Sequence, residues 1–315
     1  MSGPNSMNFE PGSLVGRFAP SPTGALHTGS LATALASWLM ARAAGGRWLL
    51  RLDDLDRPRQ VAGMADDIMT TLEAFGLWWD GEVAWQSRNQ DAYRQAFELL
   101  QQAGALYPCG CSRQEIARAA SAPHPDDDCI PYGGTCRTGM RPGGAVRSWR
   151  VRVPEGEICY DDLRHGRACQ RLSERCGDFV VRRGDGEFAY QLAVVVDDSV
   201  AGVTHVVRGD DLLPSTPRQI LLQELLGYPR PVYCHLPLVT GPCGAKLSKR
   251  DNLVSHHLGN WTGREGELLL ALLRFFGQAP PQALSGASCG EILAWGTAAF
   301  DLSRIPRSGG ELPIP

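Results

Sequence analysis

The order of apolar and polar positions in the first hundred residues is typical of an α/β fold. A short apolar run ends at Phe18, and after a turn with two prolines and a glycine the segment 31–44 is rich in Ala and Leu and contains no Gly or Pro, which predicts a helix. A second apolar run follows at 47–53. Strand, helix and strand make a βαβ unit, which binds its ligands beyond the carboxyl ends of the strands.

The same patterns predict further elements along the chain. Amphipathic or apolar periodicity predicts helices at 61–75, 87–103, 215–226, 265–276 and 289–297. Apolar runs predict buried strands at 203–209 and 232–239. The run 188–198 fits either a helix or a strand.

One region interrupts the α/β pattern. Residues 109–144 are dense in Pro, Gly, Asp and Cys, whereas alternation within 145–178 predicts short antiparallel strands. We therefore divide the chain into a flexible leader (1–13), the first half of an α/β domain (14–106), an inserted α+β subdomain (107–178), the second half of the α/β domain (179–240) and a basic loop with a short helical C-terminal part (241–315).

Composition narrows the class of protein. The 315 residues carry a net charge of −3, which argues against coating nucleic acid by bulk charge but allows a local basic surface. No apolar run reaches 18 residues and the N-terminus lacks a secretory signal, so we expect a cytoplasmic protein with no membrane partner, and a monomer.

Ten cysteines do not have the spacing of a compact disulfide framework, and a cytoplasmic chain keeps most thiols reduced. Five of them have no partner at metal-binding spacing and are interpreted as ordinary core or surface residues: Cys159, Cys169, Cys176, Cys234 and Cys289.

The start of the predicted helix at His27-Thr28-Gly29-Ser30 is suited to phosphate. A helix N-terminus offers unpaired N–H groups and partial positive charge, and Gly29 has no Cβ to hold a phosphate away. A second cationic loop, Lys246-Leu247-Ser248-Lys249-Arg250, occurs late in the chain. Each loop alone is more often a solvated turn, but the two in this order indicate a nucleotide site.

These motifs together resemble a known family. The stretch from Arg17 to Ser30 is similar to the HIGH region of class I aminoacyl-tRNA synthetases in its glutamate-specific form, and Lys246–Arg250 is similar to the KMSKS loop. The runs 188–198 and 207–213 are similar to the glutamyl-tRNA synthetase catalytic domain. The resemblance covers about residues 14–250 and implies a Rossmann-like catalytic domain that uses ATP with Mg²⁺.

The resemblance also implies roles for individual residues. Positioning and neutralisation of phosphate charge would come from His27, Lys246 and Lys249. ATP would contact His27, Gly29, Ser30 and Lys249. L-Glutamate would contact Arg17, Phe18, Ala19, Pro20, Ser21, Asp53, Tyr190 and Arg208, with Arg17 as a bidentate partner of the side-chain carboxylate.

Asp53 departs from the family pattern. Relatives carry a Glu at this position, whose implied role is to hold the substrate ammonium. The side chain of Asp53 is one methylene shorter, so its contact with the ammonium would run through a water.

A group of cysteines in the inserted subdomain indicates a structural zinc site. Cys109-Gly110-Cys111 is followed about 25 residues later by Cys136, in a region too polar to form its own core. The resemblance implies Tyr132 as the fourth ligand, whereas the side chains of Cys129 and His124 are of types that bind zinc more commonly.

Only 65 residues follow the basic loop, fewer than the helical anticodon-binding domain of a glutamyl-tRNA synthetase needs. Length and zinc subdomain resemble the glutamyl-queuosine tRNA(Asp) synthetase family, which activates glutamate without tRNA and attaches it to queuosine in the anticodon loop of tRNA(Asp). Two other functions stay open: a truncated glutamyl-tRNA synthetase that charges a tRNA 3′ end, and a non-catalytic, zinc-containing RNA-binding paralogue.

Overall fold

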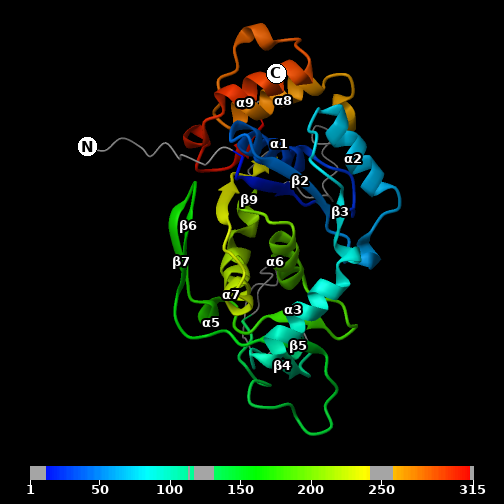
Figure 1. Ribbon diagram of the computed structural model, residues 1–315, viewed down its shortest axis with the longest axis vertical. Helices are drawn as coiled ribbons and strands as arrows, with labels where there is room; N and C mark the ends of the chain where they lie inside the picture. The colour runs from blue at the N-terminus through cyan, green and yellow to red at the C-terminus, as the bar shows by residue number, and fades with distance from the viewer. Residues whose placement is uncertain (1–11, 113, 117–130, 242–257, 313–315) are drawn as a thin grey trace, which may run out of the picture.

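Parallel strands form the centre of the molecule in the computed structural model, which describes residues 12–112, 114–116, 131–241 and 258–312. One sheet has the order β1-β2-β3, with β1 at Val15–Phe18, β2 at Arg47–Leu52 and β3 at Ala84–Trp85. A second has the order β7-β6-β10-β9, with β6 at Ile158–Asp162, β7 at Gly166–Gln170, β9 at His205–Gly209 and β10 at Val232–Leu236. The Thr204 N–H donates to the Val15 carbonyl at 2.9 Å, which brings the two sheets together beside β1 and β9 (Figure 1).

All six predicted helices are confirmed. They are α1 at Thr28–Ala43, α2 at Met64–Ala74, α3 at Gln90–Gln102, α7 at Thr216–Leu226, α8 at Glu265–Phe275 and α9 at Cys289–Ala299. The described residues also form α5 at Leu172–Arg175 and α6 at Tyr190–Val200. The ambiguous run 188–198 forms α6. Residues 191–198 of this helix are all buried, so it shows no polar face from which a helical period could be read.

Helix α1 lies between the sheet and the C-terminal helices. Leu31, Leu35 and Leu39 repeat at intervals of four on one side of α1 and are fully buried. Each buried side chain of this kind stabilises the fold by roughly 1.5–3 kcal/mol. Helices α8 and α9 pack on α1 at the end of the molecule opposite β4 and β5 (Figure 1). This packing fixes the start of α1, where the candidate site lies.

The antiparallel strands predicted after residue 145 are confirmed, but they belong to two different sheets. One antiparallel sheet has the order β4-β5-β8, with β4 at Leu106–Cys109, β5 at Ser148–Val151 and β8 at Val180–Arg183. The hairpin of β6 and β7 instead belongs to the second sheet, beside β10 and β9, because Asp162 on β6 pairs in parallel with Tyr233 on β10. Residues 158–170 of the predicted insertion therefore contribute β6 and β7 to the sheet of β10 and β9.

The prediction that Cys159 and Cys169 are ordinary thiols is wrong. These residues are directly opposite each other on β6 and β7, and a disulfide joins them. Their pairing follows from strand register, which cysteine spacing alone does not reveal.

The C-terminal segment returns to the central region. Strand β12 at Gly310–Glu311 pairs in parallel with β11 at Val239–Thr240. Residues 242–257, with the predicted basic loop at Lys246–Arg250, lie outside the described residues. None of the described helices combines the length and apolarity needed to cross a membrane.

Candidate functional site

A cavity of about 460 Å³ opens at the carboxyl ends of β1 and β9, beside the starts of α1 and α6. It is lined by every predicted glutamate and ATP residue in the described part of the chain: Arg17, Phe18, Ala19, Pro20, Ser21, His27, Gly29, Ser30, Asp53, Tyr190 and Arg208. Lys246 and Lys249 lie outside the described residues. The structure thus brings together side chains that are up to 191 positions apart in the sequence, from Arg17 to Arg208.

His27 caps the N-terminus of α1. Its Nδ1 accepts a hydrogen bond from the Ser30 N–H at 3.2 Å, so Nδ1 carries no proton and the neutral ring has its N–H at Nε2. A Cβ on Gly29 would lie 3.1 Å from two atoms of the imidazole. Gly29 therefore makes room for the capping ring as well as for a ligand, and His27 is held as a donor at the edge of the cavity.

Buried ion pairs occupy one wall of the cavity. Arg17 donates to both oxygens of Asp198, from Nε at 3.1 Å and from Nη2 at 3.3 Å. Arg51 bridges two carboxylates, since its Nε lies 2.7 Å from Asp53 and its Nη1 lies 2.6 Å from Asp198. The sequence interpretation did not include Arg51 and Asp198 among the site residues.

A third carboxylate completes this group, which we call the acid-rich cluster: Arg17, Arg51, Asp53, Asp197 and Asp198. Asp197 lies 3.7 Å from Arg51 and accepts hydrogen bonds at 2.7 Å each from Gln86, Asn89 and Tyr93. Three carboxylates face two guanidinium groups, so the cluster has one more acidic than basic group.

The carboxylates of the cluster differ in acidity. Burial raises the pKa of Asp53 to about 6, although Arg51 opposes this shift. Asp198 is also buried, but Arg17 and Arg51 together hold its pKa below the usual range. Asp53 is thus a carboxyl group whose charge changes near neutral pH, in the wall of the cavity.

Arg208 has the opposite character. It is 4% exposed, and its three nitrogens donate to neutral acceptors: Nε to His235 at 3.1 Å, Nη1 to Gln219 at 2.8 Å and Nη2 to Thr216 at 2.8 Å. Within the described part of the chain no carboxylate forms an ion pair with Arg208. Its positive charge is therefore available to an anionic ligand.

The groups at the cavity consequently carry charges of both signs. The acid-rich cluster has one more carboxyl group than guanidinium groups, with burial raising the pKa of Asp53 and Asp197, and Arg208 carries a buried positive charge that the described carboxylates leave unpaired. A ligand with both an ammonium and a carboxylate group is complementary to this arrangement.

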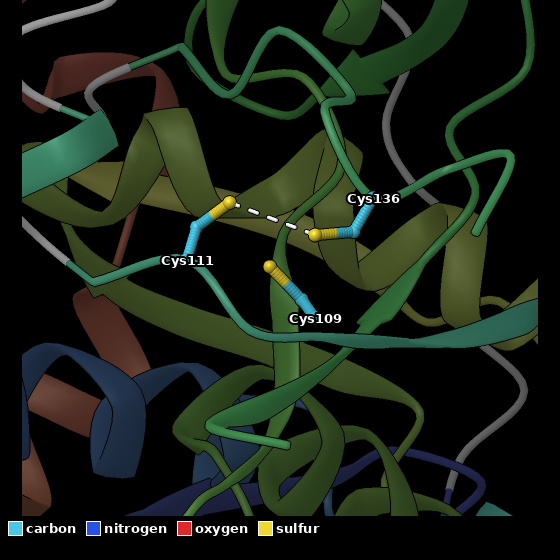
Figure 2. A group of neighbouring side chains, drawn as sticks. All are labelled: Cys109, Cys111 and Cys136. Atoms are coloured by element: carbon cyan, nitrogen blue, oxygen red, sulfur yellow. Dashed lines mark hydrogen bonds between the residues drawn. The ribbon is translucent and has the colours of Figure 1, made fainter. Parts of the chain in front are cut away.

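The predicted cysteine ligands lie together at the end of β4. The sulfurs of Cys109, Cys111 and Cys136 are all within 4.8 Å of one another, and those of Cys111 and Cys136 are 3.6 Å apart (Figure 2). Tyr132 Oη lies 3.4 Å from the Cys109 sulfur and 3.6 Å from the Cys111 sulfur. Tetrahedral zinc with Zn–S bonds of about 2.3 Å places sulfurs roughly 3.8 Å apart, so these donors fit a zinc ion. His124 and Cys129 lie outside the described residues.

A second cavity, of about 800 Å³, lies between Cys111 and the start of α6. Arg147, Arg150 and Arg183 line it, and Tyr190 lines both this cavity and the first. Two buried polar atoms in its wall, Nε of Arg150 and Oε1 of Gln191, have no hydrogen-bond partner among the described residues. The second cavity is therefore lined by three arginines and adjacent to the first.

Comparisons with known proteins agree with this geometry. The family model described as "tRNA synthetases class I (E and Q), catalytic domain" matches residues 13–287. A "Glutamyl-Q tRNA(Asp) synthetase" of Geobacter sulfurreducens is 59% identical, with 93% of this chain and 94% of that protein covered. A protein of the same name from Aromatoleum aromaticum is 52% identical, with 93% and 90% covered.

Among solved structures, a glutamate tRNA ligase from Elizabethkingia meningosepticum, crystallised in complex with its amino acid, superimposes with a TM-score of 0.78. It is 26% identical, with 95% of this chain and 67% of that chain covered. The α/β fold is therefore that of a class I tRNA synthetase catalytic domain.

Proposed function

The chain belongs to the glutamyl-Q tRNA(Asp) synthetase family of class I tRNA synthetases and is an aminoacyl-tRNA synthetase-like ligase. We propose that it activates L-glutamate with ATP, without tRNA, and transfers the glutamyl group to queuosine in the anticodon loop of tRNA(Asp). The observation that carries the proposal is the cavity beside the capped start of α1, whose lining includes Arg208 and residues of the acid-rich cluster.

Activation needs no protein base. The α-carboxylate of glutamate attacks the α-phosphate of ATP, an O–P bond forms, and the bond to pyrophosphate breaks. Catalysis then consists of positioning and of neutralising phosphate charge, to which the Nε2–H of His27 and the N-terminus of α1 would contribute. Mg²⁺, bound with ATP, supplies further phosphate neutralisation. Lys246 and Lys249 stay predicted contributors of the same kind.

Glutamate would be held by charged groups of both signs in the lining of the cavity. The Nε–Nη2 edge of Arg17 is already bound to Asp198, so Arg208 is the stronger candidate for a carboxylate of the substrate. One oxygen of Asp53 accepts from Arg51, and the carboxylate would pair with the substrate ammonium. Tyr190, Ser21 and the backbone of residues 18–20 would line the pocket.

The proposal predicts a pH dependence for glutamate binding. With the pKa of Asp53 at about 6, the carboxylate is charged above this pH and protonated below it. A protonated carboxyl group no longer attracts an ammonium, so the KM for glutamate should rise as pH falls from about 7 to 5. The Asp53→Asn variant should have a raised KM that no longer changes over this range. An unchanged pH profile in that variant would assign the titration to another group.

Cys109, Cys111, Cys136 and Tyr132 would hold one structural zinc ion. The ion would cross-link the end of β4 to the loop that carries Tyr132 and Cys136, in a lobe whose buried cluster is only a few side chains. Its role is to fix the wall of the second cavity, to which Cys111 contributes.

The second cavity would receive the RNA acceptor. Tyr190 separates it from the glutamate cavity, so a nucleobase placed there would lie next to the activated carboxyl group. Arg147 is exposed and could bind a backbone phosphate, and Arg150 and Gln191 also line this cavity.

Arg147→Ala should weaken tRNA binding and leave glutamate activation unchanged. Loss of one phosphate contact is expected to raise the KM for tRNA about 3- to 10-fold and to reduce its salt dependence by about one counterion. Arg304→Ala, an exposed arginine at the opposite end of the molecule, is the matched control. Equal KM values for the two variants would exclude the second cavity as the RNA site.

Glutamate-dependent exchange of labelled pyrophosphate into ATP tests the activation step. The proposal predicts exchange without RNA. Exchange that requires tRNA would favour a truncated glutamyl-tRNA synthetase, and a protein that neither exchanges nor binds a non-hydrolysable glutamyl-adenylate analogue would be a non-catalytic paralogue.

A further inference from the structure

Behind Arg208 lies a buried polar pair that the proposed mechanism does not use. Asp162 ends β6, His235 lies on β10 and Arg208 lies on β9, so the three residues come from adjacent strands of one sheet. The side chains of Asp162 and His235 are fully buried, and His235 Nδ1 lies 2.7 Å from Asp162. Two fully buried polar side chains need a structural or functional reason.

The Asp162 carboxylate is saturated with donors. One oxygen accepts from the backbone N–H groups of Arg164 and His165, each at 3.0 Å. The other accepts from the backbone N–H of His235 at 3.1 Å and faces Nδ1 of the same residue. Burial alone would raise the pKa of Asp162, but these hydrogen bonds lower it. Asp162 is therefore a fixed anion.

This anion sets the tautomer of His235. Because Nδ1 faces an acceptor-only carboxylate, the ring proton lies on Nδ1 and Nε2 presents a lone pair. That lone pair lies 3.1 Å from Nε of Arg208, which is always a donor. Burial and the neighbouring Arg208 charge lower the pKa of His235 against the effect of Asp162, so the ring stays neutral.

Orientation of Arg208 depends on this tautomer. Its other contacts, to Gln219 and Thr216, hold the two terminal nitrogens, and His235 holds Nε, so all three nitrogens are fixed by neutral groups. If the proton moved to Nε2 of His235, it would oppose the Nε–H of Arg208. Thr216 Oγ1, which lies 3.1 Å from Nε2 and already accepts from Arg208, would have to accept it, so the contacts of the guanidinium would rearrange.

We propose that Asp162 and His235 are positioning residues that orient Arg208 for the substrate carboxylate through a fixed histidine tautomer. The role in glutamate binding depends on the proposed function, whereas the tautomer itself does not. Neither Asp162 nor His235 lines the cavity, so the pair would act on the ligand through Arg208.

The Asp162→Asn variant separates this role from mere packing. One oxygen of Asp162 serves two backbone N–H groups, so the carbonyl of an asparagine would take that place. Its NH₂ would face Nδ1 of His235, and the backbone N–H of His235 would lose its acceptor. The ring would then keep its lone pair on Nδ1 and its proton on Nε2, against Arg208. Shape and volume are nearly unchanged.

In the full chain, Asp162→Asn should raise the KM for glutamate in the pyrophosphate-exchange assay about 10- to 100-fold, the effect of a lost hydrogen bond to a charged group. The KM for ATP should stay within about 2-fold, because the pair does not face the helix start. Cys234→Ala, a buried neighbour of His235 on β10, is the control and should leave both constants near wild type. A wild-type KM for glutamate in Asp162→Asn, or an equal rise in both constants, would overturn the proposal.

Nitrogen-15 NMR of histidine-labelled wild-type protein tests the tautomer without any variant. We expect the His235 ring, assigned by its loss in His235→Gln, to be neutral with its proton on Nδ1. A proton on Nε2, or a charged ring at neutral pH, would overturn the proposal. If wild type shows no exchange activity but the expected tautomer, the proposed function fails while the arrangement around Arg208 stands.

Discussion

Arg208→Met is expected to raise the KM for glutamate by about 100-fold or more. Removing one partner of a buried, charge-assisted contact costs about 2–5 kcal/mol, and every 1.4 kcal/mol is tenfold in affinity. Arg208 is suited to such a contact because it is buried and the described residues give it no carboxylate partner. Methionine keeps most of the side-chain volume and removes the charge.

Two measurements distinguish this effect from misfolding. The KM for ATP should stay close to wild type. Circular dichroism should show a folded protein, although the melting temperature is expected to fall because three buried acceptors lose their donor. Arg208→Lys should recover little of the lost affinity, since an ammonium cannot reproduce three directed hydrogen bonds. A KM for glutamate within about 3-fold of wild type in Arg208→Met would show that another cation binds the carboxylate.

The second large effect is expected at the cysteine group. Cys111→Ser should release the zinc ion and lower the melting temperature by more than about 5 °C, because a thiolate ligand is lost and metal binding contributes directly to folding of such a lobe. Zinc content by atomic absorption and thermal unfolding followed by circular dichroism check the two parts. We expect about one zinc ion per wild-type chain.

Cys234→Ser is the matched control, since Cys234 is a buried thiol outside the cysteine group. It should retain zinc. Unchanged zinc content in Cys111→Ser would rule out this ligand set, and transfer of glutamate to RNA by zinc-free protein at the wild-type rate would show that the lobe does not need the ion.

Local patterns predicted the helices and the opening turn well. The stretch from Phe18 to Ser30 itself contains the residues that form the turn and start the helix. These are the prolines of the turn, the histidine cap, and a glycine where a Cβ would meet the capping ring. Run 188–198 could not be assigned because helix α6 is buried on nearly all sides, and full burial removes the periodicity that distinguishes a helix from a strand.

Long-range arrangement could not be predicted in the same way. Arg51 and Asp198 are 147 positions apart, and only the meeting of β2 with α6 makes them an ion pair. Likewise, the sequence placed β6 in the insertion, and its pairing with β10 is known only from the structure. The contact of Asp162 with His235, and through it with Arg208, could therefore not be predicted.

The structure shows a second role for Gly29 at the start of α1. Gly29 was expected to admit a phosphate to the backbone, and the structure adds that it admits the ring of His27. Because Nδ1 of this ring accepts from Ser30, a neutral ring carries its proton on Nε2.

The most direct test of the central proposal is mass spectrometry of the nucleosides after reaction of the enzyme with glutamate, ATP and queuosine-containing tRNA(Asp). The proposal predicts one added glutamyl group on the queuosine nucleoside and none on the 3′-terminal adenosine. Glutamate found only on the 3′-terminal adenosine, or on no nucleoside while pyrophosphate exchange proceeds, would contradict it.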